Sequence, residues 1–310
     1  MKEEDNLERL VDTLIELGFP KTNMREYIEG CEGLNEIPYF HRRRFGDDEM
    51  SYQLTIKKDN ASGLYYPQGY EATLLQTHPV RHGSFGAIDT YELEQQMKKI
   101  TWNKTLQEVA YDPDAVKIYE DMNELLAGNA QAKDIAHRLQ LRYWIHTPIE
   151  QHLDIYKHIS DYQKHGYFPL NNGLADINTR EAYHLLSGRA VLKFYQKADG
   201  PQRFYTNWNL YDKDKLITLP NYNLVLLLKN AGVKEATQDA SGVQLIYDLI
   251  RGERPLVHIK KDNSEITVYI EADPRLKSLA VYDKDLNRIE IPGLKKNGPH
   301  RHQTITHKKK

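Results

Sequence analysis

Histidines are the first residues to test for chemistry, because the chain has 13 of them. His78 and His82 have the four-residue spacing of a helical metal-binding pair, but Pro79 between them argues against a helix. Three others lie six and seven residues apart, so a helix would point them in different directions: His152, His158 and His165. No His-Glu-x-x-His pattern occurs. We therefore expect solvated or hydrogen-bonded histidines, with no metal and no cofactor.

Other catalytic patterns are also missing from the sequence. His300 and His302 have the spacing of the metal-binding histidines of relaxases, but those need a buried strand, and these lie in the polar run KKNGPHRHQTITHKKK. The loop HGSFGA lacks the lysine and hydroxyl of a phosphate-binding loop. Cys31 has no histidine or acid that can be placed beside it. The sequence therefore predicts a protein that is not an enzyme.

A segment with strand character between residues 191 and 211 carries the stronger of two binding signals. With a period of two, Leu192, Phe194, Phe204, Trp208 and Leu210 fall on apolar faces. The opposite faces carry tyrosines, basic residues and amides: Lys193, Tyr195, Lys197, Arg203, Tyr205, Asn207 and Asn209. On a solvent-exposed sheet face, alternating tyrosine and lysine residues can bind nucleic acid, because tyrosine rings stack on bases and lysines contact phosphates. The same residues are also ordinary strand surface, and tyrosine is common at protein interfaces.

The second signal is the charge of the C-terminal tail. From Lys295 to Lys310 the chain has six Lys/Arg residues and no acid, so subtracting them from the net charge of −2 leaves about −8 for the residues before them. A basic run ending in Lys308, Lys309 and Lys310 attracts phosphate without sequence preference, although solubilising tails look the same. The acidic body favours a protein partner over nucleic acid.

The elements expected to position these residues alternate between helical and strand patterns. Apolar residues at helical spacing predict helices over 5–17 and 24–30, and alternation predicts strands around 52–56 and 64–75. Between 89 and 165 the pattern predicts four helices, the last beginning after Pro148. A helix capped by Asn178 or Thr179 and ended by Gly188 then leads into the hairpin.

These elements predict an α+β protein built from antiparallel hairpins, packed helices and an inserted helical bundle. We expect four regions: 1–88 with the first helix and strands, 89–165 as the insertion, 166–294 as a helix-hairpin region and 295–310 as a flexible basic tail. Residues 182–188 align loosely with 246–252, each followed by a strand, a polar turn and a second strand. This is either an internal repeat or the common sequence of a helix, a glycine and a hairpin.

A family resemblance is carried by three sequence segments: NTREAYHLLSGRAVLK, VYIEADPRLKSLAVYDKDLNRIEI and FGDDEMSYQLTIKKDNASGLYYPQGYEATL. They resemble uncharacterised proteins encoded on conjugative and other mobile elements of Bacteroidota, over most of the chain outside the helical insertion. The phrase from Leu186 to Val191 is also similar to a domain of unknown function found on those elements. The resemblance implies a cytoplasmic accessory protein of a mobile element. It implies no reaction and no catalytic residue.

Composition agrees with a cytoplasmic setting. The chain is 40% hydrophobic and 28% charged, as in folded globular proteins, and its acidic amphipathic start lacks the pattern of a signal peptide. The longest apolar run, Leu224 to Leu228, is far shorter than the roughly 20 residues of a membrane span. Cys31 is the single cysteine, which suits a reducing compartment. We therefore expect a cytoplasmic protein that binds a protein partner, with nucleic-acid binding as the alternative.

Overall fold

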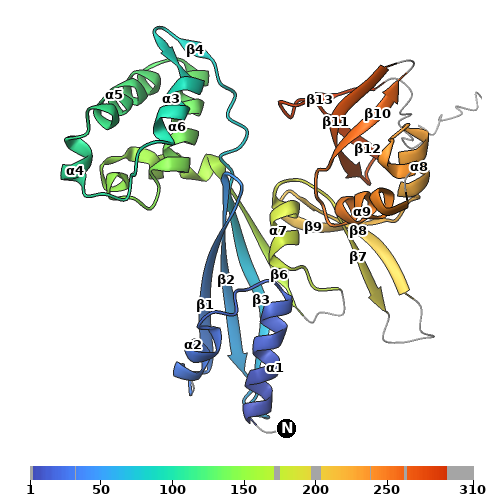
Figure 1. The fold of residues 1–310 in the computed structure, drawn as a ribbon. Coiled ribbons are helices and arrows are strands. Elements are labelled where there is room, and N and C mark those ends of the chain that lie inside the picture. The colour runs from blue at the N-terminus through green and yellow to red at the C-terminus, as the bar shows by residue number, and fades with distance from the viewer. Residues whose placement is uncertain are drawn as a thin grey trace, which may run out of the picture. The chain divides into compact units, whose positions relative to one another are not determined.

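A computed structural model gives the fold (Figure 1) and describes residues 3–31, 33–170, 175–196, 204–237, 239–261 and 264–291. The chain is α+β with antiparallel sheets, which confirms the predicted fold class. It forms two compact units that alternate along the sequence. The first unit comprises Met1–Asn35, Lys57–Gly69 and Phe168–Lys310, and the second comprises Glu36–Ile56 and Tyr70–Tyr167. No helix among the described residues is long and apolar enough to cross a membrane.

The first unit begins with two helices that the sequence predicts well. Helix α1 spans Glu3–Glu16 and α2 spans Met24–Gly30. Leu10 and Leu14 of α1 are buried, and Gly18 ends the segment with a φ of 90°, a conformation that favours glycine. Asn6 fixes α1 to strand β3 (Tyr65–Leu75), because its Oδ1 accepts from the Tyr65 amide at 2.8 Å and its Nδ2 donates to the Tyr65 carbonyl at 3.1 Å.

The rest of the first unit places a helix before each of two antiparallel sheets. Its elements are α7 (Thr179–Leu186), β7 (Val191–Gln196), β8 (Phe204–Asp212), β9 (Lys215–Pro220), α8 (Leu224–Asn230), α9 (Asp239–Ile250), β10 (Leu256–Lys261), β11 (Ser264–Asp273), β12 (Ser278–Tyr282) and β13 (Arg288–Ile289). Helix α7 begins with a capping box in which Asn178 and Glu181 exchange side chain to backbone hydrogen bonds of 2.9 Å. A single core joins both sheets and includes Trp208, Leu249 and Ile270.

The order of elements expected for an internal repeat is present twice. Helix α7 is followed by Gly188 with a φ of 84° and then by β7 to β9, and α9 is followed by Gly252 with a φ of 85° and then by β10 to β12. The two copies meet at a buried histidine. His184 of α7 lies 3.2 Å from a carboxylate oxygen of Glu253, through its Nε2. Arg180 also contacts that carboxylate, at 2.6 Å.

A four-stranded sheet in the order β1–β2–β3–β6 has most of its residues in the second unit. These strands are Glu36–Phe45, Asp48–Lys58, Tyr65–Leu75 and Gln163–Pro169. Alternation along β2 buries Met50, Tyr52 and Leu54 and leaves the residues between them partly or fully exposed, as the period of two predicts.

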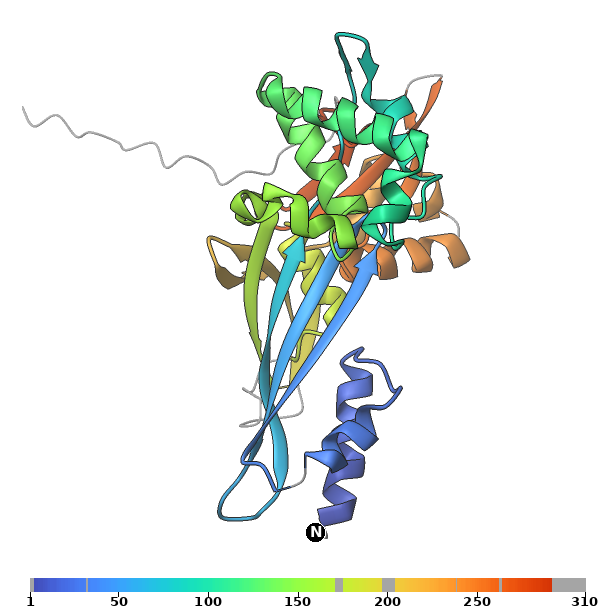
Figure 2. The ribbon, with the colours of Figure 1, turned by 90° about the vertical axis from the view of Figure 1, so that its left-hand side faces the viewer.

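The helices of the second unit pack on one another around their own core. A small hairpin, β4 (Ser84–Phe85) and β5 (Ile88–Asp89), leads into α3 (Thr90–Met97), α4 (Leu106–Ala110), α5 (Pro113–Ala127) and α6 (Ala130–Tyr143). Figure 2 shows these helices gathered at one end of the sheet strands. Their core includes Trp102, Ile118 and Trp144.

The predicted fourth helix after Pro148 is wrong. The chain instead forms three short 3₁₀ turns, η1 (Pro148–His152), η2 (Asp154–Lys157) and η3 (Ile159–Tyr162). Leu153 separates the first two because it has an extended conformation, with φ −109° and ψ 138°, and packs into the apolar clusters on both sides. Tertiary packing of this residue therefore overrides the helical spacing.

A buried polar network fixes the helices to the sheet within this unit. Glu94 of α3 accepts from Arg142 Nη1 at 2.5 Å and from the Tyr143 hydroxyl at 2.9 Å. Arg142 Nη2 donates to the Thr77 carbonyl at 3.3 Å, and the Thr77 amide donates to Asp48 Oδ1 at 2.9 Å. His82, one of the histidines tested for metal binding, contacts Glu94 at 3.0 Å, so it is a partner of a carboxylate.

Candidate functional site

The hairpin of β7 and β8 brings two of the predicted binding residues together. Tyr195 and Tyr205 are directly opposite each other in the antiparallel register. Their rings stack with centroids 5.8 Å apart and planes at 25°. Asn207 Nδ2 donates to the Tyr195 hydroxyl at 2.7 Å, which fixes the orientation of the pair. The two rings therefore lie against each other in an offset stack.

The basic residue beside this pair is already neutralised. Lys193 Nζ donates to both carboxylate oxygens of Glu181, at 2.9 and 2.8 Å, and its side chain is only 18% exposed. Val191 and Asn209, farther along the same face, are buried. The sequence predicts that this face is solvent-exposed along the whole hairpin. In the structure the part around Val191, Lys193 and Asn209 is covered, and the end with Tyr195 and Tyr205 stays partly exposed. Helix α7, which supplies Glu181, contacts both strands and is the physical reason.

The opposite face of the hairpin confirms the prediction that Trp208 lies on an apolar face. This side chain is fully buried, donates through Nε1 to Asn221 at 3.1 Å and stacks on Tyr222. Phe194 has the same parity but is 55% exposed, because it lies nearer to the hairpin end. The outer part of the hairpin thus exposes an aromatic ring on each face.

The remaining predicted binding residues lie outside the described part of the chain: Lys197, Arg203, Lys308, Lys309 and Lys310.

Sequence reasoning missed a basic and aromatic strand edge in the second unit. Strand β1, at the edge of its sheet, contains Phe40, which is 59% exposed, and three exposed arginines, Arg42, Arg43 and Arg44. Arg42 lies over the Phe40 ring at 5.6 Å and Arg43 over the Phe45 ring at 5.0 Å. The run FHRRRF is a signal that could have identified this edge. Arg42 and Arg44 approach a single acid, Glu49, at 3.7 and 3.9 Å.

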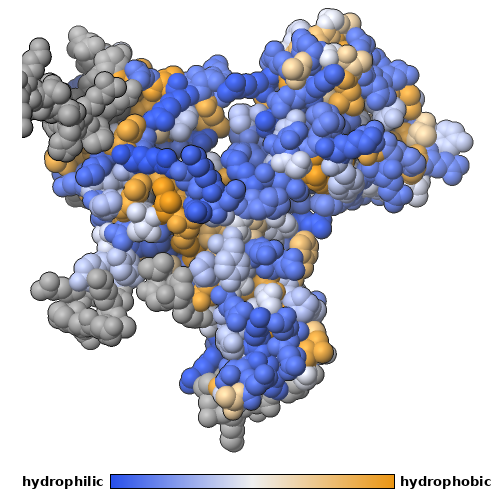
Figure 3. Space-filling view, turned by 180° about the vertical axis from the view of Figure 1, so that it is seen from behind, coloured by the Kyte–Doolittle hydropathy of each residue, from blue (hydrophilic) through white to orange (hydrophobic). Residues whose placement is uncertain are grey.

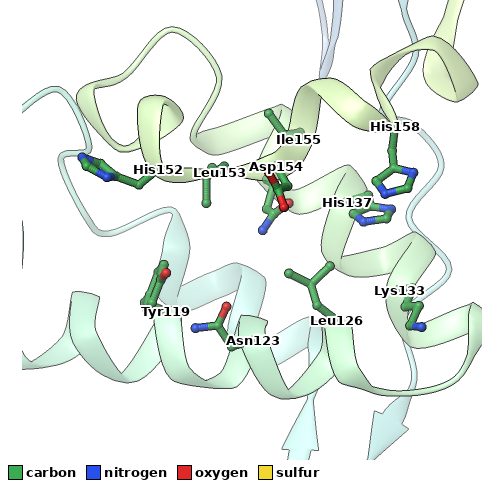
Figure 4. Close-up of a pocket in the computed structure, with 11 residues that line it drawn as sticks. Tyr119, Asn123, Leu126, Lys133, His137, His152, Leu153, Asp154, Ile155 and His158 are labelled. Atoms are coloured by element: carbon green, nitrogen blue, oxygen red, sulfur yellow. The ribbon is translucent and has the colours of Figure 1, made fainter.

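A pocket of about 440 Å³ lies among α5, α6 and the 3₁₀ turns of the second unit. Figure 4 shows residues from all three lining it. Helix α5 contributes Tyr119, Asn123 and Leu126, α6 contributes Lys133, His137 and Gln140, and the turns contribute His152, Leu153, Asp154, Ile155 and His158. The 3₁₀ turns place His152 and His158 at the same pocket, which a continuous helix would not have done.

Two imidazoles form one end of the pocket. The rings of His137 and His158 are nearly parallel, with centroids 4.8 Å apart and planes at 19° (Figure 4). Burial lowers the pKa of His137, and the neighbouring His158 adds to this effect because two adjacent imidazolium ions repel each other. Three or more metal-ligating side chains do not converge anywhere in the described residues.

A side-chain amide lies at the same pocket. Gln140 lines the pocket, and its amide makes no hydrogen bond with any described residue. The amide atoms are not enclosed by protein, so they are accessible to water or to a ligand in the pocket. No sequence pattern pointed to this residue, because glutamine is common within helices.

Comparison of the chain with models of protein families, with curated proteins and with solved structures found no match.

Proposed function

We propose that this chain is a non-enzymatic accessory protein that binds a protein partner through the outer end of the β7–β8 hairpin. The supporting observation is an aromatic set of the exposed Phe194 and Tyr205 and the half-buried Tyr195, whose neighbouring cation is paired. Aromatic side chains supply large contact areas with few rotatable bonds, and they dominate the binding energy of protein interfaces. Because Lys193 is neutralised by Glu181, its charge favours a phosphate backbone little.

Further exposed apolar side chains in the first unit support a protein partner. Val243 and Tyr247 of α9 and Leu256 of β10 are exposed. Figure 3, which views the molecule from behind, shows apolar residues in patches among hydrophilic ones over the C-terminal part of this unit. Contiguous apolar surface on a folded protein commonly marks an interaction site. The cytoplasmic setting and the mobile element belong to the same proposal and rest on the sequence phrases described above.

Quantitative affinity capture from the native host tests this proposal. The wild-type chain and a Tyr195→Ala/Tyr205→Ala variant are compared, and Tyr111→Ala, an exposed tyrosine of the second unit, is the matched control. We expect one protein to be recovered equally with wild type and control but at least about tenfold less with the double variant, as for loss of a stacked aromatic anchor. Equal recovery with all three chains would count against the hairpin as the binding site.

Strand β1 favours nucleic acid as a second candidate function. Exposed arginines beside the exposed Phe40 ring can hold phosphates while the ring stacks on a base. Fluorescence anisotropy with a single-stranded oligonucleotide over a salt series tests this candidate. If the three arginines contact phosphates, replacing Arg42, Arg43 and Arg44 with alanine should reduce the salt slope by about 2, at roughly 0.7 per phosphate contact. Binding with an unchanged slope would exclude this strand as the phosphate-contacting surface.

A further inference from the structure

The pocket of the second unit has an accessible side-chain amide on an apolar wall. Leu126, Leu153 and Ile155 line the pocket together with Gln140, whose amide makes no hydrogen bond with the described residues and is accessible in the pocket. A side-chain amide can form two hydrogen bonds with a planar edge that carries a donor and an acceptor, as glutamine does with adenine. Tyr119, 42% exposed and also lining the pocket, adds an aromatic ring on which a planar group can stack.

Lys133 supplies the positive charge at the imidazole end of the pocket, and the neighbouring imidazoles can add N–H donors to an anion, although the lowered pKa of His137 disfavours a second charge there. Lys133 precedes His137 by one helical turn on α6, and His158 lies against His137. The acids around this end have other partners: Asp154 pairs with Lys157 at 2.8 Å, and Asp134 pairs with Arg138 at 2.9 Å. Asp134 also accepts from the Tyr162 hydroxyl at 3.1 Å. Asp161 is exposed and favours the protonated form of His137.

The two ends are separated by a distance that fits one nucleotide. Lys133 and Gln140 are seven residues apart on α6, which corresponds to about 10 Å at about 1.5 Å per residue. In Figure 4, Tyr119 and Asn123 lie towards the opposite end from His137 and His158. We propose that this pocket binds a nucleoside phosphate, with the phosphate near Lys133, His137 and His158 and the base near Tyr119 and Gln140. The ligand is either a free nucleotide or the end of a nucleic-acid strand.

Isothermal titration calorimetry of the full chain at pH 6.5 and low salt tests this assignment. The probes are adenosine 5′-monophosphate, its two parts adenosine and inorganic phosphate, and a 5′-phosphorylated hexaadenylate. We expect the monophosphate to bind at least about tenfold more tightly than either part, since both ends of the pocket then contribute. Equal affinity for the monophosphate and the hexanucleotide identifies a free nucleotide as sufficient, whereas a clear preference for the hexanucleotide identifies a strand end.

Three variants locate the binding. Lys133→Ala should weaken the monophosphate about tenfold and leave adenosine unchanged, because it removes a charge that contacts phosphate. Gln140→Leu should weaken both the monophosphate and adenosine. His165→Asn is the matched control, because His165 is an exposed histidine of the same unit whose Nδ1 contacts Thr73 at 2.9 Å, outside the pocket.

Two results would overturn the proposal. One is that neither the monophosphate nor the hexanucleotide, at millimolar concentration, produces heat in calorimetry or chemical-shift changes in an NMR titration of the protein. The other is binding that Lys133→Ala leaves unchanged, which would place the nucleotide elsewhere. If Gln140→Leu does not fold, the exposed pair Lys133→Ala and Tyr119→Ala decides the question, since they act on opposite ends of the ligand.

Discussion

The buried contact between the two helix–sheet copies makes the stability of the first unit dependent on pH. His184 is 2% exposed, its Nε2 contacts Glu253, and its Nδ1 is buried with no partner among the described residues. Burial lowers the pKa of His184 to about 4, because desolvation disfavours the imidazolium ion. Its hydrogen bond to Glu253 lowers the pKa of that carboxyl to about 2.

The direction of the effect follows from proton linkage. In the unfolded chain a histidine takes up a proton near pH 6.5, whereas folded His184 does so only near pH 4. The unfolded state therefore binds more protons between these values, and the free energy of unfolding falls as the pH falls through this window. The difference corresponds to roughly 3 kcal/mol in full, of which about 2 kcal/mol is lost between pH 7 and pH 5. Glu253 acts in the same direction, but its share comes below pH 5.

Urea unfolding at pH 7 and pH 5, followed by circular dichroism, measures this loss. His184→Gln keeps a donor for Glu253 without a titrating ring, so this variant should lose about 2 kcal/mol less than the wild type over the same pH change. His258→Gln is the control, because His258 is partly exposed and also has a carboxylate partner, Glu235 at 2.6 Å. Equal pH dependence of the wild type and His184→Gln would refute the reasoning.

Three other experiments test the packing. Trp208→Ala should cost about 3–5 kcal/mol in urea unfolding, as for other buried large aromatics, and a melting temperature equal to that of the wild type would show that the ring is not in the core. Arg142→Met should cost about 3–5 kcal/mol because it leaves Glu94 charged and buried, and Arg142→Met combined with Glu94→Gln should recover part of that loss. Gly252→Ala should destabilise the chain more than Gly188→Ala. Both glycines have a positive φ, so both substitutions introduce backbone strain. A Cβ on Gly252 would also lie 2.8 Å from the His184 side chain, whereas a Cβ on Gly188 meets nothing within 4 Å. Equal losses in thermal melts would contradict the close approach at Gly252.

Local patterns in the sequence were sufficient to predict the position of many helices and strands. Helix α2 has the predicted bounds, and α7 begins at the predicted cap because Asn178 and Glu181 satisfy each other's backbone groups. Parity along β8 placed Trp208 in the core, since side chains alternate between the faces of a strand. The four predicted regions, with limits at 88, 165 and 294, remain predictions, and the compact units of the structure have other limits.

The errors come from contacts between residues that are distant in the sequence. The wet face around Lys193 and Asn209 was overestimated because α7 covers it, and the sequence does not reveal which strand face a helix will cover. The 3₁₀ turns after Pro148 depend on how Leu153 packs against its neighbours. The helical spacing of the apolar residues alone predicted one continuous helix there. The pocket around Gln140 combines three segments, so no single motif could indicate it.

Site-specific photo-crosslinking tests the proposed partner-binding hairpin most directly. Phe194→p-benzoylphenylalanine places the reactive group at an exposed ring of the hairpin, and Tyr111→p-benzoylphenylalanine places it at an exposed position of the second unit. On irradiation in the native host, we expect the first chain to form one discrete adduct with a protein, insensitive to nuclease, and the second chain to form none with that protein. A nuclease-sensitive adduct at position 194, or the same protein adduct from both positions, would contradict the proposal.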